Sequence, residues 1–132
     1  MVTIFLALGF LSASFFVGTE APTENQVVSN TALTANLVID LGGEVQGFEI
    51  EPHGENLFVL MRNKFEERGV SFAYETFTGL GELMTRIGDQ KNGAEGKYWQ
   101  FWINGTYSQV GASSYIPKAG DTIEWKFTNE QQ

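Results

Sequence analysis

The strongest constraint on the fold is the strict alternation of large side chains through residues 97–107, KYWQFWINGTY. Successive side chains of an extended strand point to opposite faces, so this run presents two different surfaces. The expected inward set is Trp99, Phe101 and Ile103. The expected outward set is Tyr98, Gln100 and Trp102. Asn104 and Gly105 both tolerate positive φ, so they predict a tight hairpin turn at the end of this strand.

Further runs predict more strands. Residues 33–41, 45–51 and 122–128 alternate between apolar and polar side chains, and the last of these is expected to bury Ile123, Trp125 and Phe127. Another strand is expected over residues 70–77, before glycines interrupt it at Gly79-Leu80-Gly81. Residues 89–96, DQKNGAEG, predict a glycine-rich loop.

One stretch has the periodicity of a helix. Its apolar side chains recur three or four positions apart, at Leu57, Leu60, Met61 and Phe65. Gly69 follows, and glycine at a helix end accepts the left-handed conformation of a C-cap. Strands on both sides of a single helix predict an α+β domain in which one helix packs on a mixed β-sheet.

Charge and cysteine content exclude several function classes. The chain has 132 residues, of which 16 are acidic and 8 are basic, so its formal net charge is −8 at pH 7. This charge repels phosphate backbones and anionic lipid headgroups, and we expect no nucleic-acid partner. The absence of cysteine excludes disulfides, thiolate nucleophiles and zinc–cysteine sites.

The first residues predict export. Residues 1–18 contain no charged side chain and are mostly apolar, which favours a cleaved signal peptide over an uncleaved membrane anchor or a buried element of the fold. Residues 19–32 predict a polar linker, residues 33–128 the folded domain and residues 129–132 a short tail. We therefore expect a secreted or extracytoplasmic protein, attached to a membrane only if residues 1–18 remain uncleaved.

Residues for catalysis are sparse. His53 is the only histidine, and its Pro-His-Gly surroundings are typical of an exposed turn. Carboxylates such as Glu49 and Glu51 flank apolar positions as a solvated face would. The glycine-rich segments lack phosphate-binding spacing, so we predict no catalytic residues, no metal site and no enzyme. Asn104-Gly105-Thr106 matches a glycosylation pattern, although the hairpin turn alone explains Asn-Gly.

Several motifs together suggest a family. They are Tyr98-Trp99 followed by Asn104-Gly105, the sequence GASSY at residues 111–115, and GDTIEW at residues 120–125. In this order, over about residues 33–127, they resemble the transcobalamin C-terminal-like β-grasp family. The resemblance implies a ubiquitin-like β-grasp sheet, an exported or surface location in bacteria, and, in the animal vitamin carriers, one half of a cobalamin clamp. The large helical domain that forms the other half in those carriers has no room in this chain.

The candidate ligand-binding residues come from two arguments. Alternation places Tyr98 and Trp102 outward, where two large aromatic side chains in water suggest contact with a partner. The resemblance adds Leu80, Gly81 and Gln100, at positions where the carriers approach the corrinoid. We therefore hypothesise a non-enzymatic extracytoplasmic module that binds a small molecule or a protein. The alternatives are a corrinoid-binding domain acting with a separate helical partner, which makes cobalamin a candidate ligand, and an adhesion or spacer module of a surface assembly.

Overall fold

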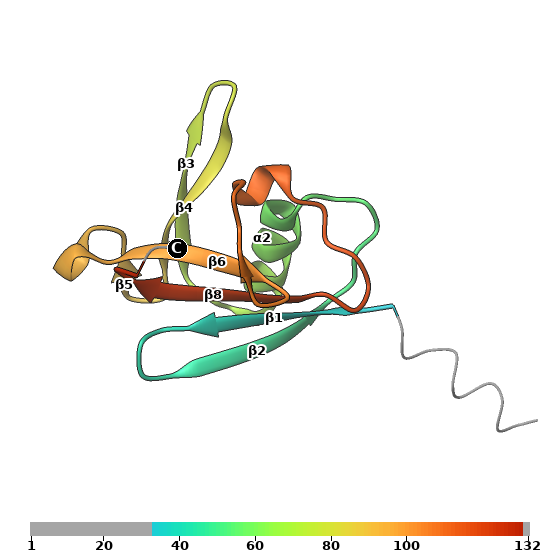
Figure 1. Cartoon of the computed structure of the whole chain (residues 1–132), viewed down its shortest axis with the longest axis horizontal. Coiled ribbons are helices and arrows are strands. Elements are labelled where there is room, and N and C mark those ends of the chain that lie inside the picture. Colours follow the sequence, from blue (N-terminus) through green and yellow to red (C-terminus); the bar gives the residue numbers. More distant parts are fainter. Residues whose placement is uncertain (1–32, 131–132) are drawn as a thin grey trace, which may run out of the picture. The chain divides into compact units, whose positions relative to one another are not determined.

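The computed structural model describes residues 33–130 (Figure 1). The predicted signal or anchor segment at residues 1–18 and the linker at residues 19–32 lie outside the described residues, as does the end of the tail. No helix within residues 33–130 is both long enough and apolar enough to span a membrane.

The main sheet has five strands in the order β2-β1-β8-β6-β7. The strands are β1 (Ala35–Asp40), β2 (Val45–Ile50), β6 (Tyr98–Ile103), β7 (Thr106–Tyr107) and β8 (Thr122–Thr128). β1 runs parallel to β8, whereas the β1–β2, β6–β7 and β6–β8 pairs are antiparallel, so the sheet is mixed as predicted. Asn104 and Gly105 have φ values of 50° and 85°, which confirms the predicted hairpin turn.

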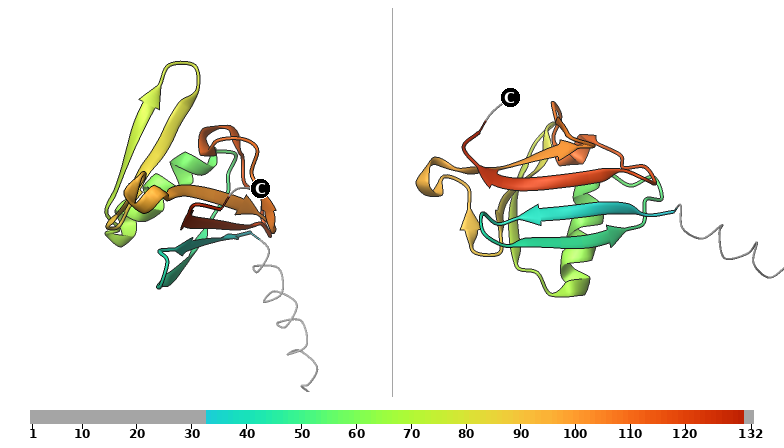
Figure 2. Two further views of the ribbon diagram at one scale, coloured as in Figure 1. Left: turned by 60° about the vertical axis from the view of Figure 1, so that its left-hand side comes forward. Right: turned by 60° about the horizontal axis from the view of Figure 1, so that its bottom comes forward.

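Helix α2 (Leu57–Arg68) covers one face of this sheet and crosses its strands (Figure 2, right). It begins at Asn56, whose side-chain oxygen accepts a hydrogen bond from the backbone N–H of Val59 at 2.9 Å. It ends at Gly69, which has a φ of 71° and closes the helix as predicted. All four residues of the predicted apolar stripe are buried against the sheet, where they join Trp125 and the inward residues of β1. The α+β fold is confirmed.

A second sheet has the order β3-β4-β5 and was not predicted. It consists of β3 (Phe72–Phe77), β4 (Gly81–Ile87) and β5 (Gln90–Lys91). The prediction of a simple loop over residues 89–96 is therefore wrong, because this segment contains β5 and a short 3-10 turn, Ala94–Gly96. Side-chain hydrogen bonds hold the segment in place. Trp99 Nε1 on β6 donates to the carbonyl of Gln90 at 2.8 Å. The Asn92 side chain, within the segment, donates to the carbonyl of Met84 on β4 and accepts from the N–H of Trp99.

Candidate functional site

The predicted residues Leu80 and Gly81 lie at the tip of the β3–β4 hairpin, which projects from the rest of the domain (Figure 1; Figure 2, left). Leu80 is 78% exposed, and Phe77 and Leu83 beside it are also exposed. Gly81 has a φ of 90°, and a Cβ atom at this position would lie 2.6 Å from Cβ of Ser113. Glycine is therefore required here for a close approach of the hairpin to the 3-10 turn η3 (Ala112–Ser114).

A groove of about 280 Å³ opens between this hairpin tip and the loop before η3. Its lining residues are mostly apolar or glycine: Phe77, Leu80, Gly81, Glu82, Leu83 and Gly111. The Ser113 hydroxyl fixes one wall, since it accepts a hydrogen bond from the Glu82 N–H at 2.9 Å and donates one to Glu82 Oε1 at 2.7 Å. We call the groove lined by these six residues the hairpin groove. The groove combines exposed apolar side chains with a backbone that the Ser113–Glu82 hydrogen bonds fix in position. Binding sites for apolar groups usually have both properties.

Phe77 and Leu83 were missed by the sequence analysis. The pairing of β3 with β4 places Phe77 opposite Gly81 and Glu75 opposite Leu83, which brings Phe77 and Leu83 to the same face of the hairpin. A register shift between Ala73 and Tyr74 precedes this pairing. The short turn at residues 78–80, between two possible strands, is a sequence signal for this hairpin. The register of the two strands could not be predicted from it, because the bulge between Ala73 and Tyr74 shifts the pairing.

On β6, the three predicted residues have different surroundings. Tyr98 is 52% exposed, as expected. Gln100 is partly buried, and its side-chain amide donates to the carbonyl oxygens of Thr128 and Glu130 at 3.1 and 2.8 Å. The amide therefore fastens the end of β8 and its tail.

The expected exposure of Trp102 is wrong, because only 8% of this residue is accessible. Its side chain does lie on the face away from the core, but neighbouring strands cover it. The ring of Tyr107 on β7 meets it edge-on with centroids 5.3 Å apart, and Lys126 Nζ on β8 lies 4.8 Å from its ring centroid. The alternation of side chains along β6 correctly predicted the sheet face on which Trp102 lies. It could not predict that Tyr107 and Lys126 cover this side chain.

The structure does not bring all five predicted residues into one groove. Leu80 and Gly81 line the hairpin groove, whereas Tyr98, Gln100 and Trp102 are absent from its walls. Whether any of the five binds a ligand stays a prediction.

The resembling motifs meet at a buried carboxylate instead. Asp121 belongs to the GDTIEW motif but was not predicted as a site residue, and it is 7% exposed. Its two oxygens accept hydrogen bonds from the hydroxyl of Tyr115, the side-chain amide of Asn104 and the backbone N–H of Lys118, the last two at 3.0 Å. We call these four residues the Asp121 cluster. The other end of the Asn104 amide accepts from the Thr122 N–H at 2.8 Å, so both ends of this side chain are engaged and its turn role is structural.

The Asp121 cluster joins distant parts of the chain. The Asp121 carbonyl accepts from the N–H of Asn36 on β1, and the Tyr115 carbonyl accepts from the N–H of Leu57 at the start of α2. Burial alone would raise the pKa of the Asp121 carboxyl, but its hydrogen bonds from Tyr115, Asn104 and Lys118 outweigh burial and hold the pKa below its ordinary value. Burial and the hydrogen bond to Asp121 raise the pKa of Tyr115 to about 12.

The free energy of unfolding should therefore decrease at alkaline pH as Tyr115 loses its proton. The unfolded chain loses this phenolic proton near pH 10, whereas the folded chain retains it to about pH 12. The contribution of Tyr115 is fully present below pH 10 and is lost as pH rises to 12. In urea unfolding at a series of pH values, the stability difference between wild type and Tyr115→Phe should shrink across this window. Tyr98→Phe is the matched control, and a constant difference for Tyr115→Phe would contradict the assignment.

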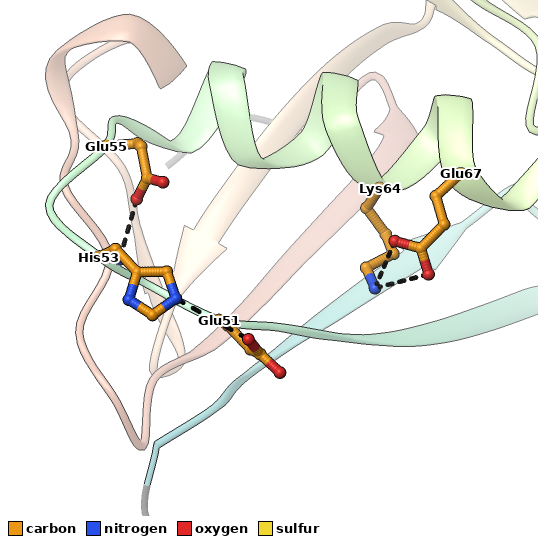
Figure 3. Close-up of polar contacts among 5 residues, drawn as sticks. All are labelled: Glu51, His53, Glu55, Lys64 and Glu67. Atoms are coloured by element: carbon orange, nitrogen blue, oxygen red, sulfur yellow. Dashed lines mark hydrogen bonds and ion pairs between the residues drawn. The ribbon is translucent and has the colours of Figure 1, made fainter.

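His53 belongs to a separate, exposed group of polar residues (Figure 3). His53 Nε2 lies 3.8 Å from Glu51 Oε1, and its backbone N–H donates to Glu55 Oε1 at 2.9 Å. Lys64 and Glu67 form an ion pair on the neighbouring helix. Within residues 33–130, no group of three or more histidine, aspartate or glutamate side chains is arranged to hold a metal ion.

A family comparison assigns the domain. Residues 54–129 match the profile of the family described as "Domain of unknown function (DUF4430)", which is a transcobalamin-like C-terminal family. The chain belongs to this DUF4430 family. The resemblance inferred from the motifs is thereby confirmed, and all members of the Asp121 cluster fall inside the matched residues. No curated protein sequence matches the chain.

Two solved structures share the fold of this DUF4430 protein. One is a protein from Ruminococcus gnavus ATCC 29149 described as a candidate metal-binding protein, with a TM-score of 0.59 and 14% identity, covering 74% of this chain and 98% of the other. The second is haptocorrin in complex with Cbi, with a TM-score of 0.62 and 19% identity, covering 73% of this chain and 25% of haptocorrin. At these identities the likeness shows the fold alone. The DUF4430 protein matches only a quarter of the length of haptocorrin.

Proposed function

We propose that this DUF4430 domain is a non-enzymatic binding module that holds the apolar part of a small molecule or protein in the hairpin groove, outside the cytoplasm. The observation that carries the proposal is the concentration of exposed apolar side chains at the tip of a projecting hairpin, where Phe77, Leu80 and Leu83 line one groove. Burying such side chains against a ligand contributes about 25 cal/mol for each Å² of apolar surface removed from water.

Two observations support the remaining parts of the proposal. The carboxylate and the phenol with shifted pKa values, Asp121 and Tyr115, are committed to each other and to the backbone, so they serve the fold and leave no free acid or base between them. The uncharged apolar residues 1–18 favour export. Tyr98 remains available as a second contact because half of it is exposed.

A corrinoid is the second candidate ligand, because haptocorrin, which has a similar fold, is described in complex with Cbi. The hairpin groove offers one wall, so a corrinoid would require a separate helical partner for its other face. Metal binding, suggested by the description of the Ruminococcus protein, has less support. Residues 33–130 of the DUF4430 protein contain no group of side chains arranged to hold a metal ion. An adhesion or spacer role would need no groove at all.

The proposal is tested with an apolar probe and a corrinoid on the full-length protein. Leu80→Ser and Leu83→Ser should each weaken binding of the dye ANS about tenfold, which corresponds to about 1.4 kcal/mol. Val45→Ser is the matched control, because Val45 is equally apolar and exposed but lies on β2. Equal dye binding by all variants would overturn the groove assignment.

Cobinamide titration, followed by tryptophan fluorescence, separates the alternatives. Saturable binding that Leu80→Ser weakens would support the corrinoid candidate. If no saturable signal appears for the free protein, lone-domain corrinoid binding is excluded while dye binding still reports on the groove. If neither probe binds, the spacer role becomes the better explanation.

A further inference from the structure

The second sheet ends in a strand whose outer edge has no partner within residues 33–130. The order β3-β4-β5 leaves the six-residue β3 paired on one side only, with β4. Figure 1 shows this edge facing away from the main sheet. Alternate residues of an edge strand direct their backbone N–H and C=O groups outward, where they can pair with another extended chain.

The side chains of β3 leave this edge open. Edge strands are usually protected by lysine, proline, bulges or very short length. The sequence of β3 is FAYETF, which contains no lysine and no proline. Its one register shift lies between Ala73 and Tyr74, so residues 74–77 form a regular stretch of edge. Both Tyr74 and Phe77 are exposed. The comparable edge strand β2 instead buries Phe48 and Ile50 and exposes one apolar side chain, that of Val45 at its first position. A partner at β3 would gain apolar contact in addition to backbone hydrogen bonds.

Charge defines the occupant. Glu75 is exposed at the centre of the edge and takes part in none of the ion pairs formed among residues 33–130. The chain as a whole carries a net charge of −8. A second copy would set the two Glu75 carboxylates close together in an antiparallel pair and add like charge, which is unfavourable. A basic side chain opposite Glu75 would instead form an ion pair.

We propose that the free edge of β3 accepts an extended segment of a partner protein, with apolar side chains at alternate positions and a lysine or arginine opposite Glu75, as an added strand of the β3-β4-β5 sheet. Main-chain hydrogen bonds would give affinity, and the aromatic and acidic side chains of β3 would give specificity. This site shares Phe77 with the hairpin groove, but Tyr74 and Glu75 are absent from the groove lining, and the proposal does not rest on the proposed function.

The test uses the full-length protein and a capped hexapeptide probe, acetyl-Thr-Val-Lys-Val-Thr-Val-amide. In ¹⁵N NMR spectra, the backbone amides of β3 should shift on titration. Glu75→Lys should weaken binding of this peptide about tenfold and should favour the same peptide with glutamate in place of lysine. Glu49→Lys, the same charge change on the edge strand β2, is the matched control and should leave the affinity unchanged.

The peptide experiment would overturn the proposal if it gave no shift at β3, shifts at β2 instead, or equal effects of Glu75→Lys and Glu49→Lys. A dimer that forms with rising concentration in analytical ultracentrifugation and blocks the peptide would assign the edge to a second copy and also overturn it. Glu75→Gln keeps the test decisive if Glu75→Lys folds poorly, since it removes the charge without reversing it. Leu80→Ser should leave peptide binding intact, which distinguishes failure of the edge from failure of the groove.

Discussion

Trp125→Ala is expected to lower the free energy of unfolding by about 3–5 kcal/mol, the usual cost of emptying an aromatic site in a core. Trp125 is 3% exposed, lies on β8 between β1 and β6, and stacks on Phe101 with ring centroids 4.6 Å apart. Its buried Nε1 has no hydrogen-bond partner within the described residues, so the loss is one of packing. Urea unfolding monitored by circular dichroism measures it.

Matched substitutions sharpen this prediction. Trp125→Phe keeps most of the ring and removes the unsatisfied donor, so it should cost much less than Trp125→Ala. Trp99→Ala should also cost about 3–5 kcal/mol, since its ring packs on Phe127 and its indole bonds to Gln90. Tyr98→Ala is the exposed control and should be nearly neutral. A Trp125→Ala loss as small as that of Tyr98→Ala would contradict the described core.

Trp102→Ala tests the correction made by the structure. Its ring is buried between Tyr107 and Lys126 on the face away from α2, so its loss should fall between those of Trp125→Ala and Tyr98→Ala. Alternation by itself would predict a loss close to that of Tyr98→Ala.

Asp121→Ala should have the second large effect, a loss of about 2–4 kcal/mol. The substitution removes the acceptor of three hydrogen bonds and leaves the Tyr115 hydroxyl, the Asn104 amide and the Lys118 N–H without this partner. Unsatisfied buried groups cost about 1–3 kcal/mol each, reduced here because part of the cluster can reach water. Thermal unfolding followed by circular dichroism, together with urea unfolding, measures this loss.

The pH dependence of Asp121→Asn provides a second readout. The folded pKa of Asp121 is below its ordinary value, so its contribution is present above the unfolded pKa and is lost as pH falls through the folded value. The difference in free energy of unfolding between wild type and Asp121→Asn should therefore become smaller as the pH is lowered. Asp40→Asn is the control, because the Asp40 carboxylate accepts only from the turn N–H of Gly42. A gap that stays constant in acid would show that the charge of Asp121 has no part in the cluster.

Much of the fold could be predicted because its patterns are local and strict. Residues 122–128 alternate without interruption, and β8 has the same bounds. Asn104-Gly105 specifies its own turn chemistry. β5 could not be found this way, since a two-residue strand is too short to have a period and is held by the side chains of Trp99 and Asn92.

The candidate site was less accessible from sequence because it depends on contacts between segments. Leu80 was found, but Phe77 and Leu83 join it only through the register of β3 and β4, which follows a bulge. Gln100 was predicted to present its side-chain amide outward to a ligand. In the structure this amide instead donates hydrogen bonds to backbone carbonyls at and after the end of β8. Asp121 lies in a turn, and its hydrogen-bond partners are 3 to 17 positions away in the sequence, so no local period marks it.

The place of β8 in the main sheet has a consequence for biosynthesis. This strand follows all the other strands of the domain in the sequence, yet it lies between β1 and β6 and supplies Ile123, Trp125 and Phe127 to the core. A growing chain that lacks residues 122–128 cannot join its first strands to its later hairpin. Contacts between such distant segments form late because closing the long loop costs entropy. The nascent domain therefore stays incompletely folded until residues 122–128 have been synthesised.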